Sequence, residues 1–371
     1  MSSIKILHCA DIHIGAADAF LGSSADSRMF ETLITFENII DLAVQNEVQL
    51  LAIAGDLFDA PTPDAAFVNP VLSKIASAPN LKVVYCAGNH DPLIAQSPFV
   101  INTLPQNLFV LPTEDTCLVF DDIKSRVYGR SFDSAHLQGE EEFSLTVPQD
   151  DYINILVQHG ELKSDLNSDY NAITPRFIRN SGMDYIALGH VHKHTPVGKL
   201  ENVSFAYCGC PEGQGFDELD EKGVYMGTVG KGSADLKFIP VARRKHIHEK
   251  IDITNVEDIS SFILETLKGR YQNFGDHLYK IELIGEIDPD STINCAELSA
   301  RLSTALYFVK IKDSTEYKID FETLAKETSL KGVFVRKMLE KQEQAEDKEA
   351  VKRALKIGLK AFGNEVKYNE D

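Results

Sequence analysis

Residues 4–15 read IKILHCADIHIG, a run of mostly apolar residues that is interrupted by Asp11 and His13. The apolar part predicts a buried β-strand that runs directly into a polar turn. Gly15 follows the turn, and glycine lets a backbone turn tightly. A polar pair at the end of a buried strand is typical of an α/β protein whose site lies at the carboxyl ends of its strands.

The same arrangement recurs four more times within the first 240 residues. In each case a strand-like apolar stretch stops, and a glycine or a ligand-type side chain follows at once. The stretches are LLAIAG (50–55) before Asp56, KVVYCAG (82–88) before Asn89, His90 and Asp91, INILVQHG (153–160) with His159, and YIALGHVH (185–192) with His190 and His192. Apolar residues with helical spacing at 28–47 and 64–77 separate the first strands. We therefore predict a layered α/β sandwich.

The pattern changes near residue 245. Strand-like stretches at 249–254, 277–285 and 307–312 alternate with helix-like segments at 256–269 and near 295–306. This alternation predicts a small α/β cap domain that follows the sandwich.

The sequence after Phe321 is helical in pattern and rich in charge. Its last part, 348–362, is amphipathic. The apolar stripe consists of Val351, Leu355, Gly358, Leu359 and Phe362. The predicted domains are 1–244 for the sandwich, 245–318 for the cap and 319–371 for a helical C-terminal segment.

The composition is that of a soluble globular protein, with 43% hydrophobic and 25% charged residues among 371. The N-terminus lacks the apolar core of a signal peptide, and no apolar run reaches 18 residues. The six cysteines are scattered and show no paired spacing. We therefore expect a cytoplasmic protein with reduced thiols and no membrane contact.

The formal net charge of −19 is unevenly distributed. Residues 1–242 carry 15 Lys and Arg against 32 Asp and Glu, whereas residues 243–371 carry 22 against 24. Affinity for nucleic acid depends mainly on cations that neutralise phosphates. Any role on nucleic acid must therefore come from metal ions, local basic spots or a partner.

The side chains at the five strand ends are Asp, Asn and His, which suit a manganese- or iron-like divalent ion better than thiolate-bound zinc. Residues two apart in an extended chain point the same way. We therefore expect Asp11 with His13, and His190 with His192, each to present two ligands to one place. Asp56 stands alone at its strand end and is the expected bridge between two ions. The candidate metal ligands are Asp11, His13, Asp56, Asn89, His159, His190 and His192.

Other histidines receive separate predictions. His90 follows a candidate ligand and is the expected catalytic residue, which stabilises the transition state or protonates the leaving oxygen, with Asp91 orienting it. His194 is expected at the rim, within reach of a substrate phosphate. His8 is expected in the core, and His246 and His248 on the surface.

The ordered motifs DIHIG, GDLFD, GNHD, QHG and GHVH resemble those of the calcineurin-like metallophosphoesterase superfamily. The fuller forms LHCADIHIG and AGDLFD resemble its SbcD-type DNA-repair exonuclease branch. The segment YCGCPEGQGFDELDEKGV (207–224) is similar to that of the bacterial YhaO group. The resemblance covers residues 1–245 by motif. One departure is Cys208-Gly209-Cys210, where the branch usually has Pro-Gly-Ser.

The resemblance implies a four-layer αββα sandwich with a small capping domain. It implies that one ion is held by Asp11, His13, Asp56 and His192, and the other by Asp56, Asn89, His159 and His190. The ions would be manganese, with iron(II) or magnesium as alternatives, and His90 would be the catalytic histidine. It further implies a DNA exonuclease or endonuclease that works with an SbcC-like SMC-type ATPase, which the segment 321–362 would grip.

Alternatives to this interpretation remain open. The acidic sandwich favours a phosphodiesterase or phosphatase that acts on a small nucleotide or lipid phosphoester. A non-enzymatic scaffold is a third possibility, although such a protein would be expected to have lost ligands. The C-terminal helices could pack on themselves or form a dimer, and the helix at 28–47 could also serve a homodimer.

Overall fold

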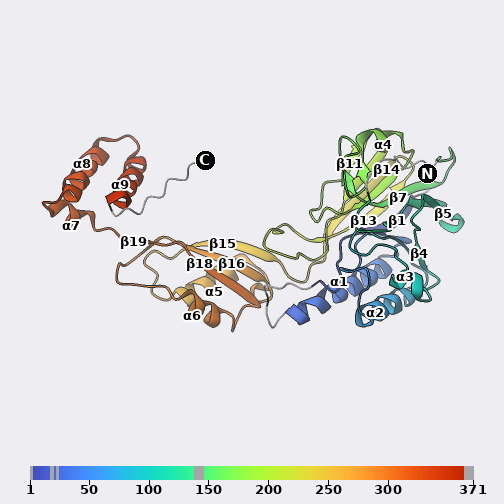
Figure 1. The fold of residues 1–371 in the computed structure, drawn as a ribbon, viewed down its shortest axis with the longest axis horizontal. Helices are drawn as coiled ribbons and strands as arrows, with labels where there is room; N and C mark the ends of the chain where they lie inside the picture. The colour runs from blue at the N-terminus through green and yellow to red at the C-terminus, as the bar shows by residue number, and fades with distance from the viewer. Residues whose placement is uncertain (1–2, 17–20, 22–24, 138–145, 363–371) are drawn as a thin grey trace. The chain divides into compact units, whose positions relative to one another are not determined.

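The computed structural model describes residues 3–16, 21, 25–137 and 146–362 (Figure 1). The chain divides into two compact units. The first comprises 1–249, 260–282 and 295–312, and the second comprises 250–259, 283–294 and 313–371. The three-domain division at 244/245 and 318/319 stays a prediction.

A six-stranded sheet has the strand order β14-β13-β1-β2-β3-β4. Its strands are β1 (Ser3–Cys9), β2 (Leu50–Ala54), β3 (Lys82–Cys86), β4 (Leu108–Val110), β13 (Gly223–Gly230) and β14 (Ser233–Pro240). Strands β1 to β4 run parallel, while β13 pairs antiparallel with β1 and β14 antiparallel with β13. The carboxyl ends of β1, β2 and β3 therefore lie at one edge of this sheet.

A second six-stranded sheet has the order β11-β12-β10-β7-β6-β5. Its strands are β5 (Thr116–Phe120), β6 (Ser125–Gly129), β7 (Ile153–His159), β10 (Tyr185–Gly189), β11 (Gly198–Leu200) and β12 (Val203–Tyr207). The four inner strands run parallel, and the two edge strands are antiparallel to their neighbours. The carboxyl ends of β7 and β10 carry the second half of the predicted site.

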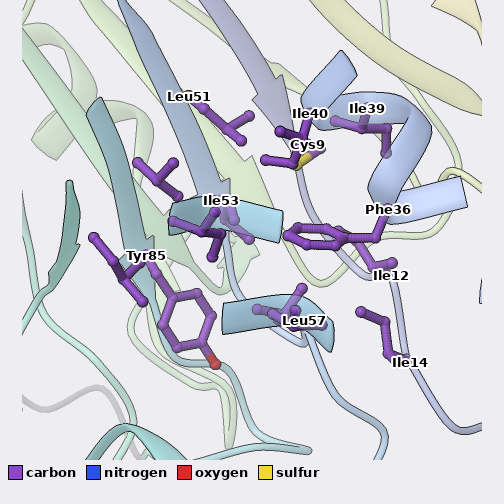
Figure 2. Close-up of a cluster of buried hydrophobic side chains, with 14 of the residues drawn as sticks. Cys9, Ile12, Ile14, Phe36, Ile39, Ile40, Leu51, Ile53, Leu57 and Tyr85 are labelled. Carbon is purple, nitrogen blue, oxygen red and sulfur yellow. The ribbon is translucent and has the colours of Figure 1, made fainter. Parts of the chain in front are cut away.

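Helices α1 (Ala25–Gln45) and α2 (Ala65–Ala76) cover one face of the first sheet (Figure 1). Figure 2 shows this layer, in which side chains of α1 meet those of the strands. The residues in contact include Phe36, Ile39 and Ile40 from the helix and Cys9, Leu51 and Ile53 from the sheet. Alternate side chains of each strand point to opposite faces, so both faces of these apolar strands must be covered.

The opposite face of the first sheet packs against the second sheet. Ile6, Ala52 and Val84 contribute to this layer from the first sheet, and Ile155 and Ala187 contribute from the second. The outer face of the second sheet is covered by α4 (Pro175–Asn180), whose Ile178 packs with residues such as Leu156 and Ile186. The layer order is αββα, which confirms the predicted sandwich.

The first unit also contains much of a three-stranded sheet, in the order β15-β16-β18. Its elements are β15 (His246–Asp252), α5 (Ile259–Arg270), β16 (Leu278–Ile284), α6 (Cys295–Leu302) and β18 (Phe308–Asp313). Ile263 and Leu267 of α5 and Leu298 and Leu302 of α6 are buried. The strands and helices expected of an α/β cap are therefore present.

The second unit contains three helices, α7 (Phe321–Lys326), α8 (Leu330–Gln344) and α9 (Lys348–Phe362). Val335 of α8 packs with Leu355 and Leu359 of α9. Part of the predicted apolar stripe therefore packs on a helix of the same unit. The short elements are α3 (Pro98–Ile101), η2 (Asp121–Ile123), β8 (Glu161–Leu162), β9 (Ala172–Ile173), η3 (Phe274–Asp276), β17 (Glu286–Ile287) and β19 (Glu316–Tyr317).

His8 is fully buried, as expected, whereas His246 is buried against Phe216 and the prediction that it lies on the surface was wrong; His248 is exposed. None of the six cysteines forms a disulfide. Within the part of the chain that is described, no helix combines the length and apolar character that crossing a membrane requires.

Candidate active site

The turns that carry the site residues have an unusual backbone. Asp11, His13 and Asp56 have φ angles of 52°, 48° and 48°, and His190 has a φ of 100°. Positive φ costs non-glycine residues about 1–3 kcal/mol each, and such strain clusters at functional sites. The Asp11 amide donates to Gly55 O at 3.0 Å and the His13 amide to Asp56 O at 3.0 Å, so the two turns support each other. The expectation of an extended chain at Asp11–His13 was therefore wrong, although both side chains reach the site.

His13 and His192 face each other across the first part of the site. Their Nε2 atoms lie 3.1 Å apart. Each Nδ1 lies beside a carboxylate oxygen, Asp59 Oδ1 at 3.0 Å from His13 and Glu218 Oε1 at 2.6 Å from His192. Carboxylates only accept hydrogen bonds, so each Nδ1 donates and a neutral ring presents a lone pair at Nε2. Two lone pairs at this distance repel each other unless a proton or metal ion lies between them.

His159 shows the same conflict in the second part of the site. Its Nδ1 donates to Ala54 O at 2.9 Å, which leaves the Nε2 lone pair facing Asn89 Oδ1 at 2.9 Å and Asp56 Oδ2 at 3.3 Å. His190 Nδ1 lies 3.2 Å from the same Asn89 oxygen. Several acceptors converge here as well, and a bound cation would satisfy them together.

Asp56 lies between these two parts of the site. Its Oδ2 is 3.3 Å from His159 Nε2 and 3.8 Å from His13 Nε2, while its Oδ1 accepts from the His90 amide at 2.9 Å. Ligand atoms of Asp11, His13 and His192 lie within 4.8 Å of one another, as do those of Asp11, Asp56 and His159. Carboxylate, amide and imidazole ligands with one shared carboxylate fit a pair of divalent ions.

The electrostatics match a site in which several acceptors converge. Burial opposes ionisation of Asp56, but the neighbouring His159 and His13 hold its pKa well below the usual range. Burial disfavours the charged His159, yet the charges of Asp56 and Asp11 raise its pKa to about 9. The acidic neighbours of His159 therefore favour a positive charge at this position.

His90 lies at the exposed side of the site, with 46% of its side chain accessible. Its Nδ1 lies 3.4 Å from Asp59 Oδ1, and this hydrogen bond raises the pKa of His90 to about 8. Asp91 was expected to orient His90. Its carboxylate instead accepts from the amides of Phe58 at 2.9 Å and Gly88 at 3.0 Å, and burial raises its pKa to about 6. Asp91 therefore connects the turn after β2 with the turn after β3, while Asp59 lies beside the imidazole of His90.

Glycine is required at two positions, because side chains of the site lie directly against the backbone there. A Cβ at Gly55, where φ is +95°, would lie 2.1 Å from His159 Nδ1. A Cβ at Gly88 would lie 2.2 Å from Asp56 Oδ1. The glycines that precede Asp56 and Asn89 therefore make room for the side chains of His159 and Asp56, two of the predicted ligands.

Beside the site lie two residues that were not predicted and one whose predicted role stays a prediction. His194 stacks on Phe238, with ring centroids 3.9 Å apart, and its contact with a substrate phosphate stays a prediction. Asp59 and Glu218 were not predicted as site residues. Asp59 lies within the GDLFD motif and could have been noticed, whereas Glu218 is 26 positions from His192 and had no local signal.

Comparisons with known proteins agree on one family. The sequence model of the calcineurin-like phosphoesterase family matches residues 4–194, a range that contains every predicted metal ligand. The uncharacterized metallophosphoesterase YhaO of Bacillus subtilis is 25% identical over 277 residues, 70% of this chain and 66% of its own.

Two further relatives carry names that refer to DNA or nuclease activity. The DNA double-strand break repair protein Mre11 of Methanopyrus kandleri is 25% identical over 240 residues, 60% of this chain and 52% of its own. The SbcD component of the SbcCD nuclease of Escherichia coli is 24% identical over 284 residues, 62% of this chain and 66% of its own. The matches thus span less than two thirds of each of these three relatives.

Proposed function

The chain belongs to the calcineurin-like phosphoesterase family, and we propose that it is a metal-dependent nuclease subunit that hydrolyses phosphodiester bonds in DNA. The observation that carries the proposal is the position of Asp56 between two sets of converging acceptors. Its Oδ2 lies 3.3 Å from His159 Nε2 and 3.8 Å from His13 Nε2. A shared carboxylate between two sets of imidazoles is the arrangement that a two-metal hydrolase needs.

Each ion would have its own set of ligands around the shared carboxylate. One set is Asp11, His13, Asp56 and His192, and the other is Asp56, Asn89, His159 and His190. Manganese is the ion that we expect. When bound, such ions generate hydroxide from water near neutral pH and stabilise charge on the phosphoryl oxygens.

The protein's own contribution is to hold the imidazoles and to supply a proton. Asp59, Glu218 and the Ala54 carbonyl each accept from an Nδ1, so the opposite nitrogens are free to coordinate. His90 is half-exposed beside Asp59, and its raised pKa keeps it largely protonated at neutral pH. In this position it can donate a proton to the leaving oxygen of the substrate.

The names of the relatives support DNA as the substrate, whereas the negative net charge of residues 1–242 disfavours it. Mre11 is named for DNA double-strand break repair, and SbcD is named as part of a nuclease. Residues 1–242 carry 17 more acidic than basic side chains, which disfavours independent binding to a polyanion. We therefore include a partner in the proposal, an SbcC-like SMC-type ATPase bound through α7–α9.

A cleavage assay with linear and hairpin-ended DNA tests the proposal. The protein is supplied with manganese, with and without the ATPase, and compared with Asp56→Asn and His90→Gln variants. Cleavage by the wild type and not by the variants is expected. Wild-type protein that binds two ions and still cuts no DNA in the presence of its ATPase would exclude the nuclease function.

The acidic sandwich also supports a second candidate, a phosphodiesterase or phosphatase for a small nucleotide or lipid phosphoester. A small substrate presents few phosphates and suffers less repulsion from the acidic surface than DNA does. Measuring kcat/KM for nucleotide phosphodiesters, lipid phosphoesters and DNA separates the two. A small ester preferred by several orders of magnitude over DNA would establish this candidate.

A further inference from the structure

Glu218 is not a predicted metal ligand, but it contacts one. Among the described residues, its hydrogen bond to His192 is the shortest that any predicted ligand makes to a residue outside the ligand set. Glu218 lies in the segment between β12 and β13, and its Oε1 is 2.6 Å from His192 Nδ1. Only 16% of the Glu218 side chain is exposed. The contact is therefore shielded from competing water, which strengthens a charge-assisted hydrogen bond.

The second oxygen of Glu218 is held by three donors. The Gln214 amide donates to Oε2 at 3.2 Å, the Cys210 thiol at 3.3 Å, and the Lys222 ammonium lies at 3.3 Å. Both oxygens of the carboxylate are therefore engaged, and rotation that released His192 would break several contacts.

The same segment also holds the backbone of His192. The amide of Cys210 and the ammonium of Lys222 donate to His192 O at 3.2 Å and 3.0 Å. His192 lies outside any helix or strand, after β10 has ended at Gly189. Contacts from this segment therefore replace the support that regular structure would provide.

We propose that Glu218 is a positioning residue for the metal centre. It holds His192 with the proton on Nδ1, so that the lone pair of Nε2 faces Asp11 and His13. In the other tautomer Nε2 would carry the hydrogen and could not bind an ion. The inference rests on the proposed metal centre. It assigns a function to the Cys208–Lys222 segment, which contains none of the predicted metal ligands.

His192, Cys210 and Glu218 also lie close enough together to be considered as a third metal site. The buried ammonium of Lys222, with 5% of its side chain exposed, already supplies a cation against Glu218. The geometry therefore favours a hydrogen-bonded support over a third ion.

Manganese titration of the metal-free protein by calorimetry tests the inference. Wild type is expected to bind two ions. Glu218→Ala is expected to bind one ion unchanged and the other about 10–100-fold more weakly. Glu218→Gln keeps a neutral acceptor and is expected to fall between them, and it serves as the second variant if Glu218→Ala does not fold. Glu221→Ala is the matched control, because it removes one negative charge nearby from a side chain that is 57% exposed and paired with Lys245.

Nitrogen-15 NMR of the metal-free protein reads the hydrogen bond itself. Nδ1 of His192 should be protonated in wild type and in Glu221→Ala, whether or not Nε2 also carries a proton, and this preference should be lost in Glu218→Ala. Unchanged tautomer and unchanged affinity for both ions in Glu218→Ala would overturn the inference. Uptake of three ions by wild type and two by Glu218→Ala would overturn it in favour of a third site. Failure to cut DNA with two ions bound would count against the nuclease and leave Glu218 unaffected.

Discussion

Oδ1 of Asp59 lies 3.4 Å from Nδ1 of His90, and the same oxygen lies 3.0 Å from Nδ1 of His13. One carboxylate outside the predicted ligand set thus contacts both a predicted ligand and the predicted catalytic residue. Because it orients both rings, its charge should matter for turnover although it binds no ion in the proposed site.

Asp59→Asn should therefore lower kcat on a phosphodiester such as bis(p-nitrophenyl) phosphate by about 10–100-fold at saturating manganese. The neutral amide holds an imidazolium less well than the carboxylate does. Steady-state kinetics check this, with Asp41→Asn as a control, since Asp41 is exposed and paired with Lys74. An Asp59→Asn enzyme as fast as wild type would remove Asp59 from the mechanism.

Manganese should stabilise the fold, because the site gathers acceptors that a shared cation would satisfy. At a concentration 100 times Kd, each ion contributes about 2.7 kcal/mol. The midpoint of thermal unfolding should rise with manganese and return when a chelator is added. The rise should be much smaller in Asp56→Asn, which loses the shared charge, and an equal rise in both proteins would place the ions elsewhere.

Gly55→Ala should damage both stability and metal binding. The new Cβ would lie 2.1 Å from His159 Nδ1, at a residue whose φ is +95°. We expect a loss of about 1–3 kcal/mol in the free energy of unfolding, from strain and from displacement of His159. Denaturant unfolding and metal analysis check this. Gly269→Ala is a suitable control, because nothing lies within 4 Å of the position that its Cβ would take.

His8 should make stability depend on pH below neutrality. Burial lowers its pKa from 6.5 to about 3 in the folded protein, where its ring contacts Tyr185 and Leu188. At a pH between about 3 and 6.5, His8 is protonated in the unfolded chain but not in the folded protein. The free energy of unfolding therefore decreases as the pH falls. From pH 7 to pH 5 the loss should be about 2 kcal/mol. Unfolding of wild type and His8→Gln with chelator present checks this, and parallel pH dependences would contradict it.

Glu31 should be critical for folding because it neutralises buried cations. Its carboxylate accepts from Arg244 at 2.6 Å and from Arg28 at 2.9 Å, and all three residues are buried. Removal of one partner from a buried ion pair costs about 3–5 kcal/mol. Glu31→Ala should lose that much in denaturant unfolding, whereas Glu297→Ala, at an exposed pair, should lose under about 1 kcal/mol. Similar losses in both variants would show that this cluster is not stabilising.

Much of the fold could be predicted because its signals are local. Five parallel strands of the core, β1, β2, β3, β7 and β10, are short apolar runs that lead directly into a glycine or a ligand-type residue, and their carboxyl ends lie at one edge of each sheet. The stretches before Asp11, Asp56 and Asn89 show this pattern, and the structure places their ends together. The strands β13 and β14 were not predicted. β13 joins the sheet by pairing with β1, more than 200 residues away along the chain, and β14 joins it by pairing with β13.

The sequence by itself determined which side chains stand at the strand ends, because strand, turn and ligand are neighbours along the chain. Tertiary structure alone decided which carboxylate faces each histidine, as with Asp59 at His90 and Glu218 at His192. It also decided the left-handed backbone of Asp11, His13 and Asp56, and the burial of His246. These features depend on segments that meet only after folding, so a local pattern of residue types does not show which groups face each other, even where it marks Asp59 within GDLFD.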